Sequence, residues 1–264
     1  NEKGNITLTN NSGDLTVTNT GNVKNNEKNT GSAGDITVTN AETSGKLTLA
    51  GLLKNFGKGD TKITSKGANG AEISGTVSNN TGNTEITNEK SELKISGTVE
   101  NKQGNTSVTN NGAGGTEISG TIANEKGNIT LTNNSGDLTV TSTGNVKNNE
   151  KNTGSAGNIT VTNAETSGKL TLAGLLKNFG KGDTKISSKG ANGAEISGTV
   201  SNNAGDTEIT NEKSELKISG TVENKQGNTS VTNNGAGGTE ISGTIANEKG
   251  NITLTNNSGD LTVT

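Results

Sequence analysis

The chain has 264 residues, of which 24% are apolar and 1% aromatic, and its formal net charge is −3. So few apolar residues cannot fill the thick core of a conventional globular enzyme, and the near balance of charges argues against nucleic-acid binding through a basic surface. His, Cys, Met, Trp, Tyr and Pro are absent and all 23 basic residues are lysine, which removes imidazole and thiolate catalysis, disulfides and sulfur-ligated metals. We therefore expect no enzymatic activity and no cofactor, while this composition leaves an intrinsically disordered spacer as one alternative.

No apolar run approaches the roughly 18 to 20 residues that a membrane-spanning helix needs, so membrane insertion is not expected. The sequence opens at Asn1 without a Met or a basic and apolar leader. We expect it to be a segment of a longer protein, with any signal or secretion domain elsewhere.

The sequence is dominated by a long internal repeat. Its first 18 residues recur at 124–141 and at 247–264, which gives long repeats over 1–123 and 124–246 and a partial third copy over 247–264. The two complete copies differ at five positions, none of them apolar: Asn19/Ser142, Asp35/Asn158, Thr64/Ser187, Thr81/Ala204 and Asn83/Asp206.

Two strand signals alternate along each long repeat, and both show the period-2 alternation of apolar and polar residues that is typical of strands. One series is centred on Leu8, Val38, Ile63, Ile86 and Val108, and the other begins at Val17 and continues with Leu49, Ile73, Ile95 and Ile118. Units of 22–25 residues are too short to bury an apolar face alone, so they are stabilised by stacking on one another. The sequence predicts an all-β fold, a parallel β-helix (β-solenoid) that runs through residues 1–264 as one domain of about 11 coils, with one longer coil in each 123-residue repeat.

A narrow solenoid needs few inward residues in each coil, which explains the low apolar content. Around Ile73 the predicted inward residues are Ala71, Ile73, Val77 and Ile86.

Stacking places equivalent residues above one another, so structural columns can be predicted. One Asn column is expected to hydrogen-bond along the axis, side chain to side chain, and to satisfy turn backbone groups; its members are Asn25, Asn55, Asn79, Asn101 and Asn124. A second column contains Asn10, Asn40, Ser65, Asn88 and Asn110, and beside it lies a Thr column with Thr9, Thr39, Thr64, Thr87 and Thr109.

A glycine column is predicted where the strand turns a corner and a side chain would obstruct it; it contains Gly51, Gly75, Gly97 and Gly120. Replacement of one of these by Val should cost more than replacement of Gly34. A charged column is expected to place opposite charges on adjacent coils and so to help fix the register; its members are Thr48, Glu72, Lys94, Glu117 and Thr139.

The longer coil contains a predicted insertion of about eight residues, roughly Lys24 to Gly34, with a copy at Lys147 to Gly157. As a loop that projects from the rod it is a candidate contact site for a receptor, although a tolerated surface loop is the more economical interpretation. The candidate contact residues are Asn25, Asn26, Glu27, Lys28 and Asn29.

Thr-x-Thr pairs such as Thr7/Thr9 and Thr37/Thr39 raise the alternative of an ice-binding surface, but the column of Thr7 continues with Lys62, Glu85 and Ser107 and breaks the regular double row. A polysaccharide-cleaving β-helix would need clustered carboxylates, whereas Asp14, Asp35 and Asp60 are interpreted as scattered turn residues.

The phrases Gly4-Asn5-Ile6-Thr7-Leu8-Thr9-Asn10 and Gly13-Asp14-Leu15-Thr16-Val17-Thr18, set in a His-free, Asn/Thr/Gly-rich series of short coils, resemble the shafts of large bacterial exoproteins. The nearest families are filamentous-haemagglutinin-type and high-molecular-weight adhesins exported by two-partner secretion. The resemblance implies a right-handed β-helix, an extracellular location at the bacterial cell surface and a role in attachment. Because the chain has no proline, it cannot contain the Asn-Pro-Asn type signature of that family's secretion domain, which places it in the shaft.

The leading hypothesis is therefore a structural fibre or stalk segment of a bacterial surface or secreted adhesin, which gives length and rigidity and presents a distal binding region. Expected partners are the chain itself, by end-to-end or repeat stacking, and a host or neighbouring-cell receptor bound by regions outside this segment. The alternatives are the rigid stick of a contact-dependent toxin-delivery exoprotein and an ice-binding repeat surface.

Overall fold

A computed structural model shows an all-β chain that winds into three parallel sheets, and it describes residues 1–41, 43–151, 153–164 and 167–264. Sheet A contains eleven strands: β1 (Ile6–Asn10), β4 (Ile36–Asn40), β7 (Thr61–Ser65), β10 (Thr84–Asn88), β13 (Thr106–Asn110), β16 (Ile129–Asn133), β19 (Ile159–Asn163), β22 (Thr184–Ser188), β25 (Thr207–Asn211), β28 (Thr229–Asn233) and β31 (Ile252–Asn256).

Sheets B and C complete each coil. Sheet B contains β2 (Leu15–Val17), β5 (Leu47–Leu49), β8 (Ala71–Ile73), β11 (Leu93–Ile95), β14 (Thr116–Ile118), β17 (Leu138–Val140), β20 (Leu170–Leu172), β23 (Ala194–Ile196), β26 (Leu216–Ile218), β29 (Thr239–Ile241) and β32 (Leu261–Val263). Sheet C contains β3 (Asn22–Asn25), β6 (Leu52–Asn55), β9 (Thr76–Asn79), β12 (Thr98–Asn101), β15 (Thr121–Asn124), β18 (Asn145–Asn148), β21 (Leu175–Asn178), β24 (Thr199–Asn202), β27 (Thr221–Asn224) and β30 (Thr244–Asn247).

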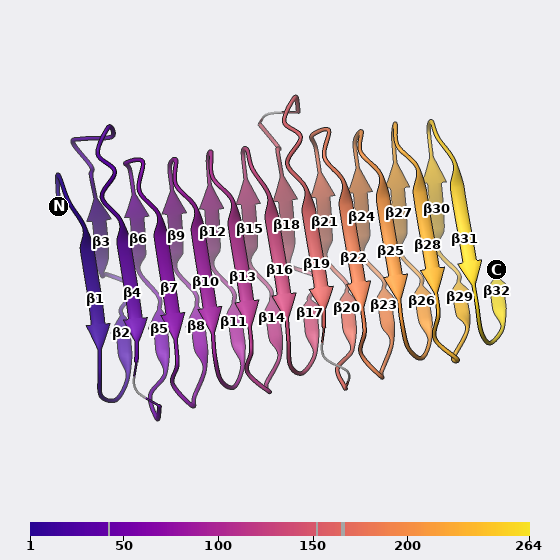
Figure 1. Cartoon of the computed structure of the whole chain (residues 1–264), viewed down its shortest axis with the longest axis horizontal. Helices are drawn as coiled ribbons and strands as arrows, with labels where there is room; N and C mark the ends of the chain where they lie inside the picture. Colours follow the sequence, from indigo (N-terminus) through magenta and orange to yellow (C-terminus); the bar gives the residue numbers. More distant parts are fainter. Residues whose placement is uncertain (42, 152, 165–166) are drawn as a thin grey trace.

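Each run of three successive strands makes one coil, so coil 1 is β1 to β3, coil 2 is β4 to β6, and coil 11 is β31 and β32. In Figure 1 the chain descends through the near sheet A, rises through the far sheet C and advances from left to right, which makes the solenoid right-handed. The β-helix predicted from the sequence and its right hand are thus confirmed.

Coil length varies in a regular way within each long repeat. Successive strands of sheet A begin at residues 6, 36, 61, 84, 106 and 129, so the coils are 30, 25, 23, 22 and 23 residues long before the pattern recurs. The longer coil contains the expected extra residues, but they do not form one insertion. The β3–β4 connection (26–35) takes the largest share, and the β2–β3 connection (18–21) takes the rest, compared with the equivalent connections of the 22-residue coil.

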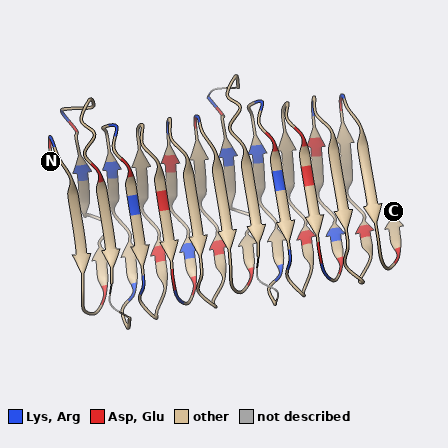
Figure 2. Cartoon of the chain, viewed as in Figure 1, with Lys and Arg blue, Asp and Glu red and all other residues tan. Residues whose placement is uncertain are grey.

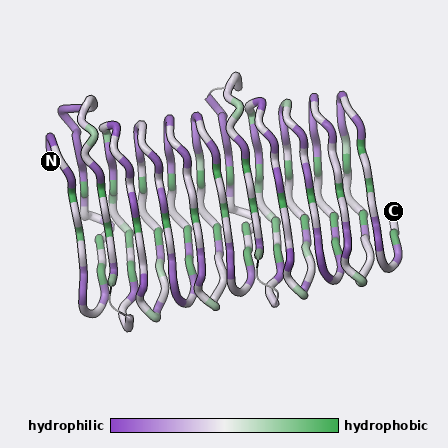
Figure 3. The backbone as a smooth tube through the Cα atoms, in the orientation of Figure 1, coloured by the Kyte–Doolittle hydropathy of each residue, from purple (hydrophilic) through white to green (hydrophobic). Residues whose placement is uncertain are grey.

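The core is a thin continuous column because the strands alternate buried apolar residues with more exposed polar ones. Figure 3 shows the apolar positions as green segments that recur along the strands of successive coils. The predicted inward residues Ala71, Ile73, Val77 and Ile86 are all at most 4% exposed. Equivalent residues pair in register between coils, for example Ile63 with Ile86 and Val77 with Val99, so apolar side chains stack on apolar side chains along the rod. None of the described segments forms a helix of the length and apolarity needed to cross a bilayer.

Candidate functional site

The broadest regular surface of the molecule is the outward side of sheet A, here called face A. Its side chains form three rows along the rod, set by the in-register pairing of the strands. The first row is Thr7, Thr37, Lys62, Glu85, Ser107, Thr130, Thr160, Lys185, Glu208, Ser230 and Thr253; the second is Thr9, Thr39, Thr64, Thr87, Thr109, Thr132, Thr162, Ser187, Thr210, Thr232 and Thr255; the third, just beyond the strand ends, is Asn11, Ala41, Lys66, Glu89, Asn111, Asn134, Ala164, Lys189, Glu212, Asn234 and Asn257.

The second row bears a hydroxyl on every coil, and the charges of face A gather on two pairs of coils. Lysines lie on β7 and β22 and glutamates on the next strands, β10 and β25, as the blue and red segments of the near sheet show (Figure 2). Within each pair the charges attract: Lys62 Nζ lies 3.4 Å from Glu85 Oε2, and Lys185 Nζ lies 3.8 Å from Glu208 Oε2.

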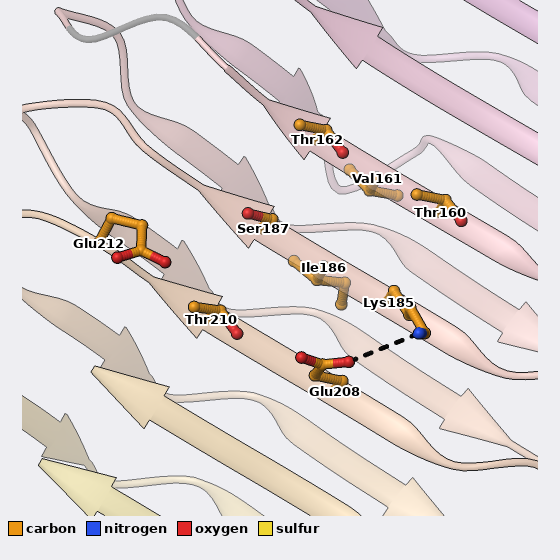
Figure 4. A pocket seen from close by; sticks show the side chains of 9 residues that line it. All are labelled: Thr160, Val161, Thr162, Lys185, Ile186, Ser187, Glu208, Thr210 and Glu212. Carbon is orange, nitrogen blue, oxygen red and sulfur yellow. Dashed lines mark ion pairs between the residues drawn. The ribbon is translucent and has the colours of Figure 1, made fainter. Parts of the chain in front are cut away.

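A shallow hollow of about 340 Å³ lies on face A over coils 7 to 9. Figure 4 shows that its rim consists of outward hydroxyl and charged side chains, including Thr162, Ser187 and the Lys185–Glu208 pair. A similar hollow in the first long repeat is lined by Lys62, Lys66, Glu85 and Glu89. Across the described ranges, no three His, Cys, Asp or Glu residues are placed to hold a metal ion. The arrangement is therefore suited to contact with an extended surface rather than to holding a small substrate.

The five predicted Asn ladder residues lie at the end of sheet C, in the sheet C Asn column, and each is at most 2% exposed. Their amides bind backbone atoms of the turns rather than one another. The Asn101 Nδ2 donates to the carbonyls of Gly82, on the preceding coil, and of Asn105, on its own turn, at 2.9 and 3.1 Å. Its Oδ1 accepts the backbone N–H of Gly104 at 3.0 Å. Asn101 thus closes its own turn and ties it to the one before. The same holds for Asn124, whose Nδ2 donates to Gly104 O and Asn128 O. Asn79 closes only its own turn, by donating to Asn83 O.

Direct amide-to-amide bonds run instead through the second column, at the end of sheet A, which we call the sheet A Asn column. Asn10 donates to Asn40, Asn88 to Asn110, and Asn110 to Asn133, with Nδ2–Oδ1 distances of 3.2, 2.8 and 3.1 Å. The series continues through Asn163, Asn211, Asn233 and Asn256 except where Ser188 intervenes.

Serine interrupts this ladder once in each long repeat. The hydroxyl of Ser65 donates to the carbonyl of Gly70 on its own turn and reaches neither neighbouring Asn. In consequence the Nδ2 of Asn40 and the Oδ1 of Asn88 are buried without a hydrogen-bond partner. Ser188 leaves the equivalent pair of atoms, Asn163 Nδ2 and Asn211 Oδ1, in the same state. The ladder break therefore accounts for four of the buried polar atoms that lack partners.

The predicted glycine column lies at the corner between sheets B and C, where successive coils approach closely. A Cβ built on Gly75 would overlap the carbonyl oxygen of Gly51, and one on Gly97 would overlap that of Gly75. Gly51 and Gly120 have the same environment. The expectation that Gly34 tolerates a side chain better is wrong, because a Cβ there would overlap the carbonyl oxygen of Gly4.

The candidate contact loop is only partly available for contact. Asn25 and Asn26 are fully buried, and the Asn26 Nδ2 donates to Gly34 O at 3.0 Å and to Asn55 Oδ1 at 2.9 Å. These two residues fasten the base of the loop, because both amides at its start donate to the carbonyl of Gly34 at its end. Glu27 and Lys28 are exposed and form ion pairs with Lys24 and Glu2, and Asn29 is half-buried. The β3–β4 and β18–β19 connections both project from the same side of the rod (Figure 1).

The charged column of sheet B has the expected register, since Lys94 is paired with Glu72 on one side and Glu117 on the other. The ion pair of Lys94, however, is with Glu92 on its own coil, at 3.3 Å. The hydrogen bond and charge of Glu92, followed by the charges of Glu117 and Glu72, raise the pKa of Lys94 above its ordinary value. In the second long repeat Lys217 instead pairs with Glu240 on the next coil, at 3.2 Å.

One column was missed by sequence reasoning. At the turn before sheet A an Asn or Asp occurs in every coil: Asn5, Asp35, Asp60, Asn83, Asn105, Asn128, Asn158, Asp183, Asp206, Asn228 and Asn251. The Oδ1 of each of the first ten accepts the backbone N–H of the equivalent residue in the next coil. We call it the Asx column. The prediction that Asp35 and Asp60 are scattered turn residues is thus wrong, because both belong to this continuous column. The signal was present in the sequence, because each member lies one residue before a strand of sheet A.

Comparison with known proteins gives no identification. No protein-family model matches the chain, and neither a curated protein nor a solved structure matches it significantly.

Proposed function

We propose that this chain is a length of the rigid shaft of a bacterial adhesin, secreted or held at the cell surface, which spans distance and presents a binding region located elsewhere. The observation that carries the proposal is continuity: sheets A and B run through all eleven coils and sheet C through ten, in a single order. Neighbouring coils share three backbone ladders as well as the Asx column, so force or bending applied at one coil is passed to the next.

The way in which the two long repeats join favours the same function. The two long repeats pair with each other through β13–β16, β14–β17 and β15–β18 in the register used inside each repeat. Each added copy therefore extends the rod by five coils, or about 24 Å at the spacing of neighbouring strands. A shaft can lengthen by duplication of 123 residues without a change in the register of its strands.

The proposal is tested by arrays of one, two and four long repeats placed between a cell-surface anchor and a reporter binding domain. We expect the reporter to stand farther from the membrane by about 24 Å per repeat, measured by electron microscopy. We also expect cells to reach a ligand buried in a polymer brush only with the longer arrays. Binding to target cells by the array without the reporter, or a reach that does not increase with repeat number, would overturn it.

The rigid stick of a toxin-delivery exoprotein would use the same rod, and the sequence that follows the array distinguishes the two. A toxin domain at the distal end favours delivery.

Ice binding would require two aligned hydroxyl rows over many coils. The second row of face A has a hydroxyl on every coil, but the first row is interrupted by the Lys62–Glu85 and Lys185–Glu208 pairs. Face A therefore has only one continuous hydroxyl row. We expect no thermal hysteresis from the array.

A further inference from the structure

The charges of face A follow a pattern that the shaft function does not require. Lysines occupy the first and third rows of coil 3, as Lys62 and Lys66, and glutamates occupy the same rows of coil 4, as Glu85 and Glu89. Coils 8 and 9 repeat this arrangement with Lys185, Lys189, Glu208 and Glu212. All eight side chains are exposed. The coils between and beyond these pairs present hydroxyls, amides and Ala41 or Ala164 on the three rows.

This pattern is complementary to itself in one orientation. A two-fold axis in the plane of face A, parallel to the strands and passing through coil 6, brings coil 3 of one copy against coil 9 of the other and keeps each row opposite its own row. Lys62 then faces Glu208 of the second copy, and Lys66 faces Glu212. The hydroxyls of coils 5, 6 and 7 face one another at the centre.

The opposite orientation is disfavoured. A two-fold axis along the rod would place each coil against the same coil and the first row against the third. Lys62 would then face Lys66 of the second copy and Glu85 would face Glu89, so like charges would meet at every charged coil. In the antiparallel arrangement like charges meet only at the rim, where Asp60 approaches Asp206 across the turns that lead out of face A.

The size and shape of face A suit such a contact. The strands stay nearly parallel along the rod, so the face is close to flat (Figure 1). Eleven strands of five residues cover about 50 Å by about 16 Å, on the order of 800 Å² for each copy, which is what a standard stable interface buries on each partner.

We propose that face A is a self-association surface through which two copies of this chain pair face to face with antiparallel axes and a two-fold axis at coil 6. The second-row hydroxyls form the centre of the interface, and Lys62, Lys185, Glu85 and Glu208, with their third-row neighbours, fix its orientation and its register along the rod. This inference does not depend on the shaft function, because it follows from face A alone.

The first experiment measures orientation. The chain has no Cys, so single cysteines at exposed third-row positions can carry nitroxide spin labels without competing sites. In the antiparallel pair, labels at Asn134→Cys on coil 6 lie close together, within about 20 Å, whereas labels at Asn11→Cys on coil 1 are separated by ten coils, or about 50 Å. Short distances at both positions would indicate parallel pairing and would overturn the proposal.

The second experiment tests the charges by sedimentation equilibrium. We expect the unmodified chain to form dimers that weaken as salt rises from 50 to 500 mM. Replacement of Lys62, Lys66, Lys185 and Lys189 by Glu makes all the charges of coils 3, 4, 8 and 9 on face A negative and should weaken dimerisation at least tenfold.

The control variant adds the reverse changes, in which Glu85, Glu89, Glu208 and Glu212 become Lys. It has twice as many substitutions but restores complementarity, so dimerisation should return, with circular dichroism checking that both variants keep their strands. A chain that remains monomeric at millimolar concentration, or a four-Glu variant that dimerises as well as the unmodified chain, would show that face A does not pair in this way.

Discussion

The Asn side chains that end sheet A and those that end sheet C are equally buried, yet they connect neighbouring coils by different means. Asn101, in sheet C, donates to a backbone carbonyl of the preceding turn, and Asn88, in sheet A, donates to the side chain of Asn110. A backbone carbonyl is present whatever residue occupies the neighbouring position, so the sheet C link is insensitive to sequence. The sheet A link requires Asn on both coils and fails at Ser65. One residue type thus supplies a robust connection in one column and a specific one in the other.

The largest loss of stability is expected when the side-chain amide of Asn101 or of Asn110, in the middle of the rod, is removed. Asn101→Ala removes the amide that bonds the Gly82 carbonyl and the Gly104 N–H. Asn110→Ala removes the amide that bonds the buried Gly112 N–H and the side chains of Asn88 and Asn133. Each should cost about 2 to 4 kcal/mol in the free energy of unfolding, because buried polar groups lose hydrogen bonds. Urea unfolding followed by circular dichroism measures this. The matched control is Asn111→Ala, since Asn111 is exposed and bonds only to other exposed side chains. A loss as large as that of Asn110→Ala would contradict the role assigned to burial.

Double-mutant cycles distinguish the two kinds of link. Asn110 and Asn133 share a side-chain bond, so their Ala substitutions should be coupled by about 1 kcal/mol. Asn101 and Asn124 share no side-chain bond and are linked only through the backbone of Gly104, so their substitutions should be coupled more weakly than those of Asn110 and Asn133. Equal coupling in both cycles would remove the distinction between the columns.

Repair of the broken ladder should stabilise the protein. Ser65→Asn would provide an acceptor for Asn40 Nδ2 and a donor for Asn88 Oδ1, with a gain of about 1 to 2 kcal/mol. The turn after Ser65 has the length of the turn after Asn110, and Gly70 and Gly115 have φ of 77° and 78°, so an Asn fits the local backbone. Ser188→Asn should give a similar gain in the second repeat, measured as a higher urea midpoint. Ser65→Ala, which loses the bond to Gly70, should instead be destabilising.

The exposed Asx column provides a milder comparison. Only an Oδ1 acceptor is required there, so Asp60→Asn should change the unfolding free energy by less than about 0.5 kcal/mol, while Asp60→Ala should cost about 1 kcal/mol. The natural exchanges Asp35/Asn158 and Asn83/Asp206 follow the same rule. A large cost for Asp60→Asn would mean that charge, and not the acceptor, matters at this turn.

The smallest effect concerns Lys94. Because its pKa is raised in the folded chain by Glu92 and by Glu117 and Glu72, its contribution to stability is present at neutral pH and is lost as pH rises through that raised pKa. Glu92→Gln should lower the pKa of Lys94, which can be followed by NMR of a ¹³C-labelled lysine side chain. A pKa of Lys94 that is unaffected by Glu92→Gln would contradict the assigned cause.

The fold could be predicted from the sequence because the period-2 pattern and the repeat specify a stack without knowledge of any distant contact. Val77, for example, can be assigned to the core from the sequence alone, because it is aligned with Val99 and Leu53 on the neighbouring coils. The chemistry of the columns could not be predicted in the same way. Whether Asn101 binds a side chain or a carbonyl depends on the shape of the turn, and the burial of Asn26 depends on the positive φ of 60° that turns its side chain inward. Sequence spacing fixes which residues stack, but not which way their amides point.

The broken ladder also has a mechanical consequence. When the ends of the rod are pulled apart, the boundaries between coils bear the load in series, so the weakest boundary yields first. The boundaries on either side of Ser65 and of Ser188 lack an amide link that neighbouring boundaries have. We expect the rod to open at these sites under tension, at intervals of 123 residues, releasing slack in equal steps while the segments between them stay wound.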